Sequence, residues 1–247
     1  MVDPQTEPEP RTARLPSIER GSGPPLVLVH GFAQNSRCWG PLDEQWATDH
    51  RVVAVDAPGH GGRNEVADDL WSTADRLALT GGRAVYLGYS MGARMCLHLA
   101  LSHPEVVSGL ILVSGTAGIE DATARAERRA GDAQLAAGIV VAGVDTFLEH
   151  WLSQPLFATL PPEMRHLEAR RRNSAAGLAS SLELAGTATM DPPLWDRLGE
   201  IASPTLVAAG ALDTKFVDTA RRLADGISGS TLALVEGAGH TVHLEQP

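Results

Sequence analysis

The sequence predicts an α/β protein with a mostly parallel, doubly wound sheet and a helical lid insertion. Six short apolar runs, rich in Val and Leu, alternate with helix-like segments. Runs this short and unbroken are typical of strands buried on both faces of a parallel sheet, with helices as crossovers. One long interval contains helix-like sequence and no strand-like run. The six runs are Leu26–Val29, Val52–Val55, Ala84–Leu87, Leu110–Val113, Thr205–Ala208 and Thr231–Val235.

These segments divide the chain into three parts. Residues 1–14 are proline-rich and polar without apolar periodicity, which predicts a disordered tail. Residues 15–114 and 204–247 hold all six strand-like runs and form the predicted sheet core. Residues 115–203 predict a helical lid over the carboxyl ends of the strands, because ordinary crossovers are much shorter. The alternative for this interval is a set of additional crossover helices.

Composition limits the classes of partner. The 247 residues carry a formal charge of −10 with 43% hydrophobic residues, which suits one globular domain. Nucleic acid and anionic membrane surfaces both require a net basic face, so we expect neither as a partner. The strand-like apolar runs are also far shorter than a membrane span. We expect a monomer or a weak homo-oligomer that binds a small-molecule substrate.

Cysteine and histidine usage indicates the compartment and the absence of cofactors. Cys38 and Cys96 are too few for a disulfide framework, and the N-terminus lacks a signal pattern, so we expect a cytoplasmic protein. His240 and His243 have no Cys or Glu at a metal-ligand spacing. The glycines of the chain do not form the patterns that bind dinucleotides or phosphates. We therefore expect no metal and no cofactor.

The third apolar run ends in Gly88-Tyr89-Ser90-Met91-Gly92 and is followed by a helix-like stretch. This Gly-X-Ser-X-Gly pattern is typical of a turn so sharp that the serine backbone is strained, with glycines on both sides to avoid clashes. A serine hydroxyl becomes reactive only when a histidine takes its proton and an acid orients that histidine. Ser90 is therefore a candidate catalytic residue that needs two partners.

Asp213 and His240 supply those partners. Each follows the end of a strand-like run, as Ser90 does, and the order Ser, Asp, His is that of nucleophile-elbow enzymes. Taken singly, Asp213 could be a helix N-cap and His240 a loop histidine. Their joint placement at three strand ends favours a catalytic triad.

A loop after the first run completes the candidate site. An oxyanion requires two backbone N–H donors aimed at one point. Phe32, in Val29-His30-Gly31-Phe32, and Met91, the residue after the candidate nucleophile, are the predicted oxyanion-hole donors. His30 is interpreted as structural, because His240 already fills the position of the base.

The motifs together resemble the α/β-hydrolase superfamily. They are His30-Gly31-Phe32, Asp56-Ala57-Pro58-Gly59-His60-Gly61, the serine elbow, Asp213 and Gly239-His240. Epoxide hydrolases and haloalkane dehalogenases have an aspartate at the elbow, so the chain is similar to the serine branch. The resemblance implies the α/β-hydrolase fold.

Arginines indicate the kind of substrate. Arg94 lies one helical turn after Ser90, and the predicted lid contains Arg125-Ala126-Glu127-Arg128-Arg129 and Arg170-Arg171-Arg172. A planar guanidinium pairs with a carboxylate through two hydrogen bonds. Arginines that converge on one pocket of an acidic protein predict an anionic substrate with several carboxylates. For most of these arginines the alternative is a solvated helix face.

A second set of motifs runs through the predicted core and lid. It comprises Gly88–Arg94, the arginine stretch ending at Arg128, Trp151 with Gln154–Phe157, Arg172 five residues before Gly177, and Asp213–Phe216. This set resembles the 2-succinyl-6-hydroxy-2,4-cyclohexadiene-1-carboxylate synthases of menaquinone biosynthesis. It implies a lyase that eliminates pyruvate from a cyclohexene bearing succinyl, carboxylate and enolpyruvyl groups, with the triad serine as the base. It also implies that Arg94, Arg128 and Arg172 hold substrate carboxylates and that Tyr89 and Trp151 line the pocket.

Two departures from the family pattern and two alternative functions remain. Arg63 stands where family members commonly have serine, either as an extra anion contact or as a surface change. The chain ends at Pro247, where the superfamily normally continues in a helix, and we expect the cost to fall on stability. The alternative functions are a serine carboxylesterase or C–C bond hydrolase of a small carbonyl substrate, and a non-catalytic small-molecule receptor on the same fold.

Overall fold

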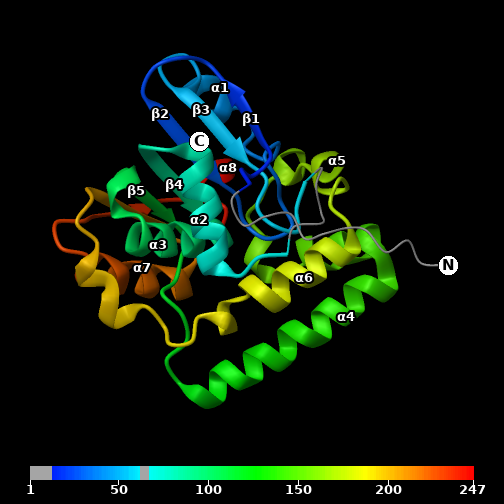
Figure 1. The fold of residues 1–247 in the computed structure, drawn as a ribbon. Helices are drawn as coiled ribbons and strands as arrows, with labels where there is room; N and C mark the ends of the chain where they lie inside the picture. The colour runs from blue at the N-terminus through cyan, green and yellow to red at the C-terminus, as the bar shows by residue number, and fades with distance from the viewer. Residues whose placement is uncertain (1–12, 62–66) are drawn as a thin grey trace.

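The computed structural model describes residues 13–61 and 67–247 (Figure 1). The hypothesis about Arg63, and all but the last two residues of the predicted tail, lie outside the described residues. Seven strands form one sheet in the order β1-β3-β2-β4-β5-β6-β7. The strands are β1 (Ser17–Arg20), β2 (Pro25–Val29), β3 (Arg51–Val55), β4 (Ala84–Tyr89), β5 (Val107–Val113), β6 (Thr205–Gly210) and β7 (Thr231–Val235).

All six apolar runs form strands, and every pairing between them is parallel. The predicted fold class is confirmed. Sequence reasoning missed β1, which pairs antiparallel with β3 at the edge of the sheet. Its sequence, Ser-Ile-Glu-Arg, is mostly exposed and has no apolar run. Main-chain pairing with β3 fixes this strand, and a hydrophobicity pattern does not register such pairing.

Alternate residues of the same strands enter two different cores. Val27 and Val29 belong to the core formed with α2, α3 and α7. Leu26 and Leu28 pack on the opposite face with Trp39 and the region around α1 and α8. Burial on both faces is the reason why these strands are continuous apolar runs. The eight α-helices of the described residues are α1 (Leu42–Trp46), α2 (Leu70–Gly81), α3 (Met91–Ser102), α4 (Ala122–Leu152), α5 (Leu167–Arg170), α6 (Ala175–Ala185), α7 (Thr214–Gly226) and α8 (Val242–Glu245).

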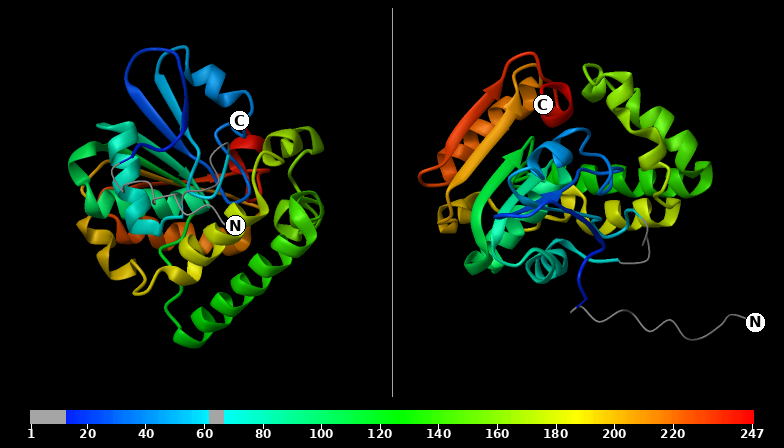
Figure 2. Two further views of the ribbon diagram at one scale, coloured as in Figure 1. Left: turned by 45° about the vertical axis from the view of Figure 1, so that its right-hand side comes forward. Right: turned by 90° about the horizontal axis from the view of Figure 1, so that it is seen from above.

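The chain between β5 and β6 is entirely helical or irregular. Helix α4 packs along α6 through Ile139, Phe147 and Leu178, and Figure 2 shows these inserted helices gathered on one side of the sheet. Both helices begin at a capping side chain. Asp121 accepts a hydrogen bond from the Ala124 N–H, and Ser174 accepts one from the Gly177 N–H. Between the helices and β6 lie the 3₁₀ segments Pro155–Phe157, Pro162–Arg165, Thr187–Thr189 and Trp195–Glu200.

Helix α4 is long and apolar enough to cross a membrane by length and composition alone. Core helices of globular proteins pass the same test, and α4 shares a buried cluster with α6. The expectation that membranes are not partners stays a prediction.

Gly143 interrupts α4 with φ of 79° and ψ of 169°. Nothing lies within 4 Å of a Cβ built at this glycine. We expect Gly143→Ala to destabilise the protein by about 1 kcal/mol, because a non-glycine residue disfavours positive φ. Gly138→Ala is the matched control in the same helix, also with open space around its Cβ. We expect it to stabilise by about 0.5–1 kcal/mol in urea denaturation. Equal effects of the two changes would contradict the backbone explanation.

Candidate active site

Ser90 lies at a strained turn between β4 and α3. Its φ of 51° and ψ of −103° are rarely adopted by residues other than glycine. A Cβ at Gly92 would overlap the Val29 carbonyl oxygen, and one at Gly88 would overlap the Gly92 carbonyl. The glycines of the motif are thus required by backbone approach, and the Ser90 side chain projects at the carboxyl end of the sheet.

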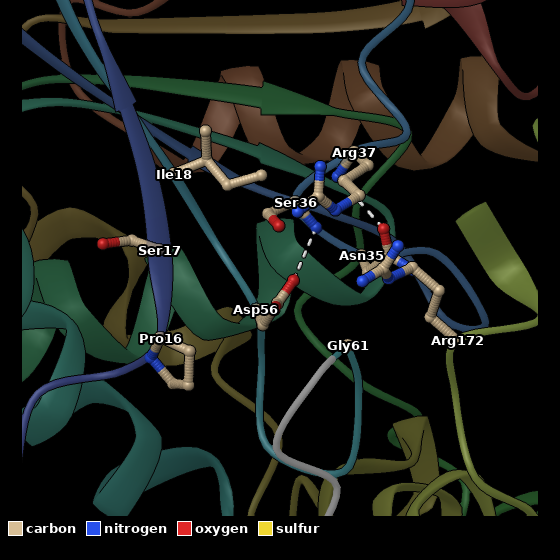
Figure 3. A pocket seen from close by; sticks show the side chains of 9 residues that line it. All are labelled: Pro16, Ser17, Ile18, Asn35, Ser36, Arg37, Asp56, Gly61 and Arg172. Atoms are coloured by element: carbon tan, nitrogen blue, oxygen red, sulfur yellow. Dashed lines mark hydrogen bonds between the residues drawn. The ribbon is translucent and has the colours of Figure 1, made fainter.

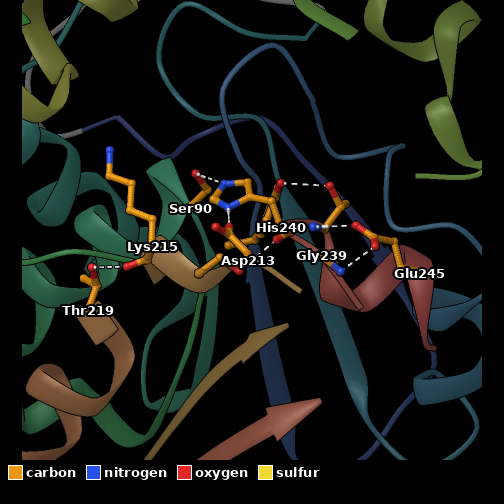
Figure 4. A network of polar contacts seen from close by, with 10 residues as sticks. Ser90, Asp213, Lys215, Thr219, Gly239, His240 and Glu245 are labelled. Carbon is orange, nitrogen blue, oxygen red and sulfur yellow. Dashed lines mark hydrogen bonds and ion pairs between the residues drawn. The ribbon is translucent and has the colours of Figure 1, made fainter. Parts of the chain in front are cut away.

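Ser90, His240 and Asp213 form a hydrogen-bonded chain (Figure 4). His240 Nδ1 is 2.7 Å from Asp213 Oδ2, and His240 Nε2 is 3.1 Å from Ser90 Oγ. The Asp213 carboxylate can only accept, so Nδ1 carries the proton and Nε2 is free to accept the serine proton. Ser90 follows β4, Asp213 follows β6 and His240 follows β7.

The loop that carries His240 is held on both sides. Glu245, on α8, accepts hydrogen bonds from the Gly239 N–H at 2.6 Å and from the Thr241 N–H at 2.9 Å (Figure 4). Ser114 Oγ donates to the His240 carbonyl at 2.8 Å. The imidazole also packs edge-on against Phe216, with ring centroids 4.5 Å apart. These contacts fix the base in position. Sequence reasoning missed Glu245, because its role depends on the contact between the His240 loop and α8.

Two neutral histidines shape the loop after β2. His30 Nε2 accepts from the Ala57 N–H at 3.0 Å, and His60 Nε2 accepts from the Ala33 N–H at 3.2 Å. Burial lowers the pKa of His30 to about 4. Burial, and next the electrostatic effect of the neighbouring His30, lowers the pKa of His60 to about 3. His30 therefore acts as a structural side chain that accepts from backbone.

The two predicted oxyanion donors, the Phe32 and Met91 N–H groups, have no acceptor among the described residues. Met91 is the first residue of α3, and a first-turn N–H has no acceptor within its helix. The N–H groups on either side of Phe32 are occupied, by Gln34 Oε1 and by His60 Nε2. Within the part of the chain that the structure describes, the Phe32 N–H has no acceptor. Both groups are thus available to an oxyanion.

A pocket of about 380 Å³ opens onto Ser90 and His240. Of the substrate residues predicted from sequence, Tyr89, Arg94, Arg128 and Trp151 line it, together with Phe32 and Met91. The helical segments between β5 and β6 supply one side of the pocket, and the carboxyl ends of the strands supply the other. The other lining residues are Gln34, Gly131, Asp132, Leu135, Gln154, Leu156, Phe157, Arg170, Ser181, Leu182, Ala185, Gly186, Thr187, Lys215 and Phe216.

Arg94 and Arg128 meet in this pocket from α3 and α4. Arg94 is buried, and it donates to Thr187 Oγ1 and to the Ala185 carbonyl, each at 2.9 Å. Burial and the neighbouring Arg128 charge lower the pKa of Arg94 to about 10, so it remains a cation at neutral pH. Arg128 pairs with Asp132 at 2.8 Å. Two cations thus face a single carboxylate.

Arg172, which the family resemblance implied for the substrate, is not in the triad pocket. It lines a separate pocket of about 160 Å³ with Asn35, Arg37 and Asp56 (Figure 3). Arg170 lines the triad pocket in its place. The single turn of α5 ends at Arg170, so helical spacing does not extend to Arg172. The role that the family resemblance implied for Arg172 in substrate binding therefore stays a prediction, and the structure places Arg172 outside this pocket.

Lys215 is a further pocket residue to which the sequence assigned no role. It lies two residues after Asp213 and extends beside the triad (Figure 4). The Asp213–Phe216 motif contains Lys215, and it was the sequence feature that could have indicated a role for this residue. Across residues 13–61 and 67–247, no group of three or more His, Cys, Asp or Glu side chains could hold a metal ion. The expectation of a metal-free site stays a prediction.

The fold and the site geometry define the class of protein. The family described as the alpha/beta hydrolase family matches residues 26–247, and the chain belongs to it. Its elbow, strand order and triad agree with that membership.

Particular relatives narrow the similarity. A Bacillus subtilis protein named "Putative 2-succinyl-6-hydroxy-2,4-cyclohexadiene-1-carboxylate synthase" is 35% identical, covering 90% of this chain and 85% of the relative. The 2-succinyl-6-hydroxy-2,4-cyclohexadiene-1-carboxylate synthase of Salmonella paratyphi A is 31% identical, covering 91% and 89%. The structure of MenH from S. aureus matches with a TM-score of 0.83 and 34% identity, covering 93% of this chain and 90% of that one. A thermophilic esterase from Thermogutta terrifontis matches with a TM-score of 0.77 and 25% identity, covering 94% and 88%.

Proposed function

We propose that this protein is a lyase of menaquinone biosynthesis that eliminates pyruvate from a polycarboxylated enolpyruvyl-cyclohexene. The product is 2-succinyl-6-hydroxy-2,4-cyclohexadiene-1-carboxylate. The synthases at 31–35% identity support this proposal, since the alignment spans most of each chain. The two buried, free cysteines fit our expectation of a cytoplasmic enzyme.

One observation from the structure carries the proposal. Four cationic side chains line the triad pocket, and Asp132 is the one carboxylate among the lining residues. The chain as a whole has a formal charge of −10, so this local excess of positive charge is opposite to the overall balance. A substrate with several carboxylates neutralises such a pocket, whereas a simple ester does not. The four cations are Arg94, Arg128, Arg170 and Lys215.

The geometry supports a reaction that begins with proton abstraction from carbon. His240 Nε2 accepts the Ser90 hydroxyl proton, and Ser90 Oγ then removes the ring proton next to the succinyl ketone. The electron pair moves onto the ketone oxygen, which the Phe32 and Met91 N–H groups stabilise. When the ketone C=O re-forms, the electron pair returns to the ring and a second ring C=C bond forms. The ring C–O bond breaks at the same time, and pyruvate leaves as its enolate. The proton held by His240 returns to the leaving group.

Pyruvate release tests this function directly. Purified protein is mixed with the enolpyruvyl substrate, and pyruvate is followed with lactate dehydrogenase and NADH. We expect turnover without any burst of covalent acyl-enzyme. The esterase similarity supports one competing function, a serine carboxylesterase. Rapid hydrolysis of p-nitrophenyl esters with a burst phase, and no pyruvate release, would establish that alternative and overturn the lyase. Tight ligand binding without any turnover would instead indicate a receptor.

Arg128→Ala is expected to raise the KM for the enolpyruvyl substrate by about tenfold or more, with a smaller change in kcat. The guanidinium lines the pocket but makes no contact with the triad, so its loss removes substrate binding rather than chemistry. Arg129→Ala is the matched control, because the Arg129 guanidinium donates to the Ala188 carbonyl and is not a pocket residue. Steady-state kinetics on both variants decides the point. Unchanged kinetics in Arg128→Ala would contradict the proposed role of the lid in binding.

A further inference from the structure

We propose that Gln34 determines substrate specificity by donating its side-chain amide to one carboxylate of the substrate, beside Arg170. This inference rests on the proposed function and adds a residue that the family resemblance did not supply. Gln34 lies two residues after Phe32, lines the triad pocket and is only 1% exposed.

The orientation of the Gln34 amide follows from its hydrogen bonds. Oε1 accepts from the Gly31 N–H at 3.0 Å. A flipped amide would place two donors against each other, so the NH₂ group points away from Gly31. That Nε2 atom is buried and has no acceptor among the described residues. A buried N–H group without an acceptor costs free energy, so a pocket ligand with an oxygen at this point gains a hydrogen bond to the amide.

The backbone under Gln34 is held rigidly relative to Arg170. Asn173 Nδ2 donates to the Ala33 and Gln34 carbonyls at 3.2 and 3.4 Å. Arg170 Nη1 donates to the same Ala33 carbonyl at 3.1 Å. Arg170 and Gln34 are therefore fixed next to each other at the same pocket.

Arg170 determines which kind of oxygen binds at Gln34. Its side chain is 1% exposed, and its other donor contact is to the Arg165 carbonyl. No carboxylate pairs with it within residues 13–61 and 67–247. A buried cation is stable when an anion compensates its charge. A substrate carboxylate would accept from the Gln34 amide and neutralise Arg170, whereas a neutral carbonyl would satisfy only the amide.

Binding of 2-succinylbenzoate, measured by calorimetry, tests the assignment without any turnover. This stable aromatic compound carries a succinyl ketone and a ring carboxylate, as the proposed product does. Gln34→Glu keeps the acceptor for the Gly31 N–H and replaces the donor by a second oxygen. We expect its Kd to rise at least about a hundredfold, because a carboxylate then faces the ligand carboxylate. Gln34→Leu should raise Kd about ten- to a hundredfold.

Controls separate this inference from structural effects. Gln45→Leu, at an exposed position on α1 outside the pocket, should leave the Kd within twofold. The dimethyl ester of the probe should lose much less affinity than the diacid in Gln34→Leu, because a neutral carbonyl accepts a weaker hydrogen bond from the amide than a carboxylate does. Equal losses for diacid and diester, an unchanged Kd in both Gln34 variants, or no binding of the diacid to wild type would each overturn the assignment. Wild type that binds the diacid in a Gln34-dependent way but releases no pyruvate would overturn only the proposed function.

Discussion

Ser90→Ala is expected to lower kcat for pyruvate release by at least about 10³-fold. The alanine removes the only oxygen within hydrogen-bond reach of His240 Nε2, at 3.1 Å, among the described side chains. Without it, no group is placed to take a proton from the substrate carbon. Alanine at this turn keeps the same backbone requirement as serine, so the fold and the substrate carboxylate contacts should persist.

A binding measurement and a control variant show whether Ser90→Ala loses chemistry or substrate binding. The Kd for 2-succinylbenzoate should change little in Ser90→Ala, which separates loss of chemistry from loss of binding. Ser153→Ala is the control, because its exposed hydroxyl donates only to the His150 carbonyl at the end of α4. Turnover in Ser90→Ala near the wild-type rate would exclude Ser90 as the base and would assign the reaction to another group of the pocket.

Acid is expected to destabilise the protein steeply below about pH 6.5. Burial lowers the pKa of His30 and His98 to about 4 and that of His60 and His243 to about 3. Between these values and 6.5, the unfolded chain binds protons that the folded chain does not. The free energy of unfolding therefore falls as the pH falls, by up to about 1.4 kcal/mol per pH unit for each such histidine. Urea denaturation at pH 7.5, 6 and 5 measures this slope.

A substitution of His243 tests how much one buried histidine contributes to the pH dependence of the free energy of unfolding. Among the described residues, neither of its buried ring nitrogens has a hydrogen-bond partner, and its ring centroid lies 4.9 Å from that of Trp39 and 4.5 Å from that of Tyr89. His243→Phe keeps the ring packing and removes one group that titrates differently in the two states. We expect higher stability at pH 5 and a slope smaller by about one proton. His150→Gln, at an exposed position, is the control. An equal slope in both variants would contradict the contribution of His243.

Much of the candidate site could be predicted because its determinants are local. The Gly-X-Ser-X-Gly turn is forced by clashes within a few residues, as the positions around Gly88 and Gly92 show. The buried parallel strands bring their carboxyl ends to one edge, so Asp213 and His240 meet Ser90 there. The edge strand β1 left no such pattern, because its pairing is made by main-chain groups.

By itself, the sequence determined the fold class. It also predicted the serine elbow, the grouping of Ser90 with Asp213 and His240, and arginine-rich helices between residues 115 and 203. These features follow from the spacing of apolar residues along the chain and from steric clashes near the glycines. Both effects act over short stretches of chain. Only the tertiary structure decided that Arg170 rather than Arg172 lines the triad pocket. It also decided that the buried Gln34 amide has an unused donor there. Side-chain direction outside regular helices depends on packing against distant segments, so residue spacing alone could not assign either group.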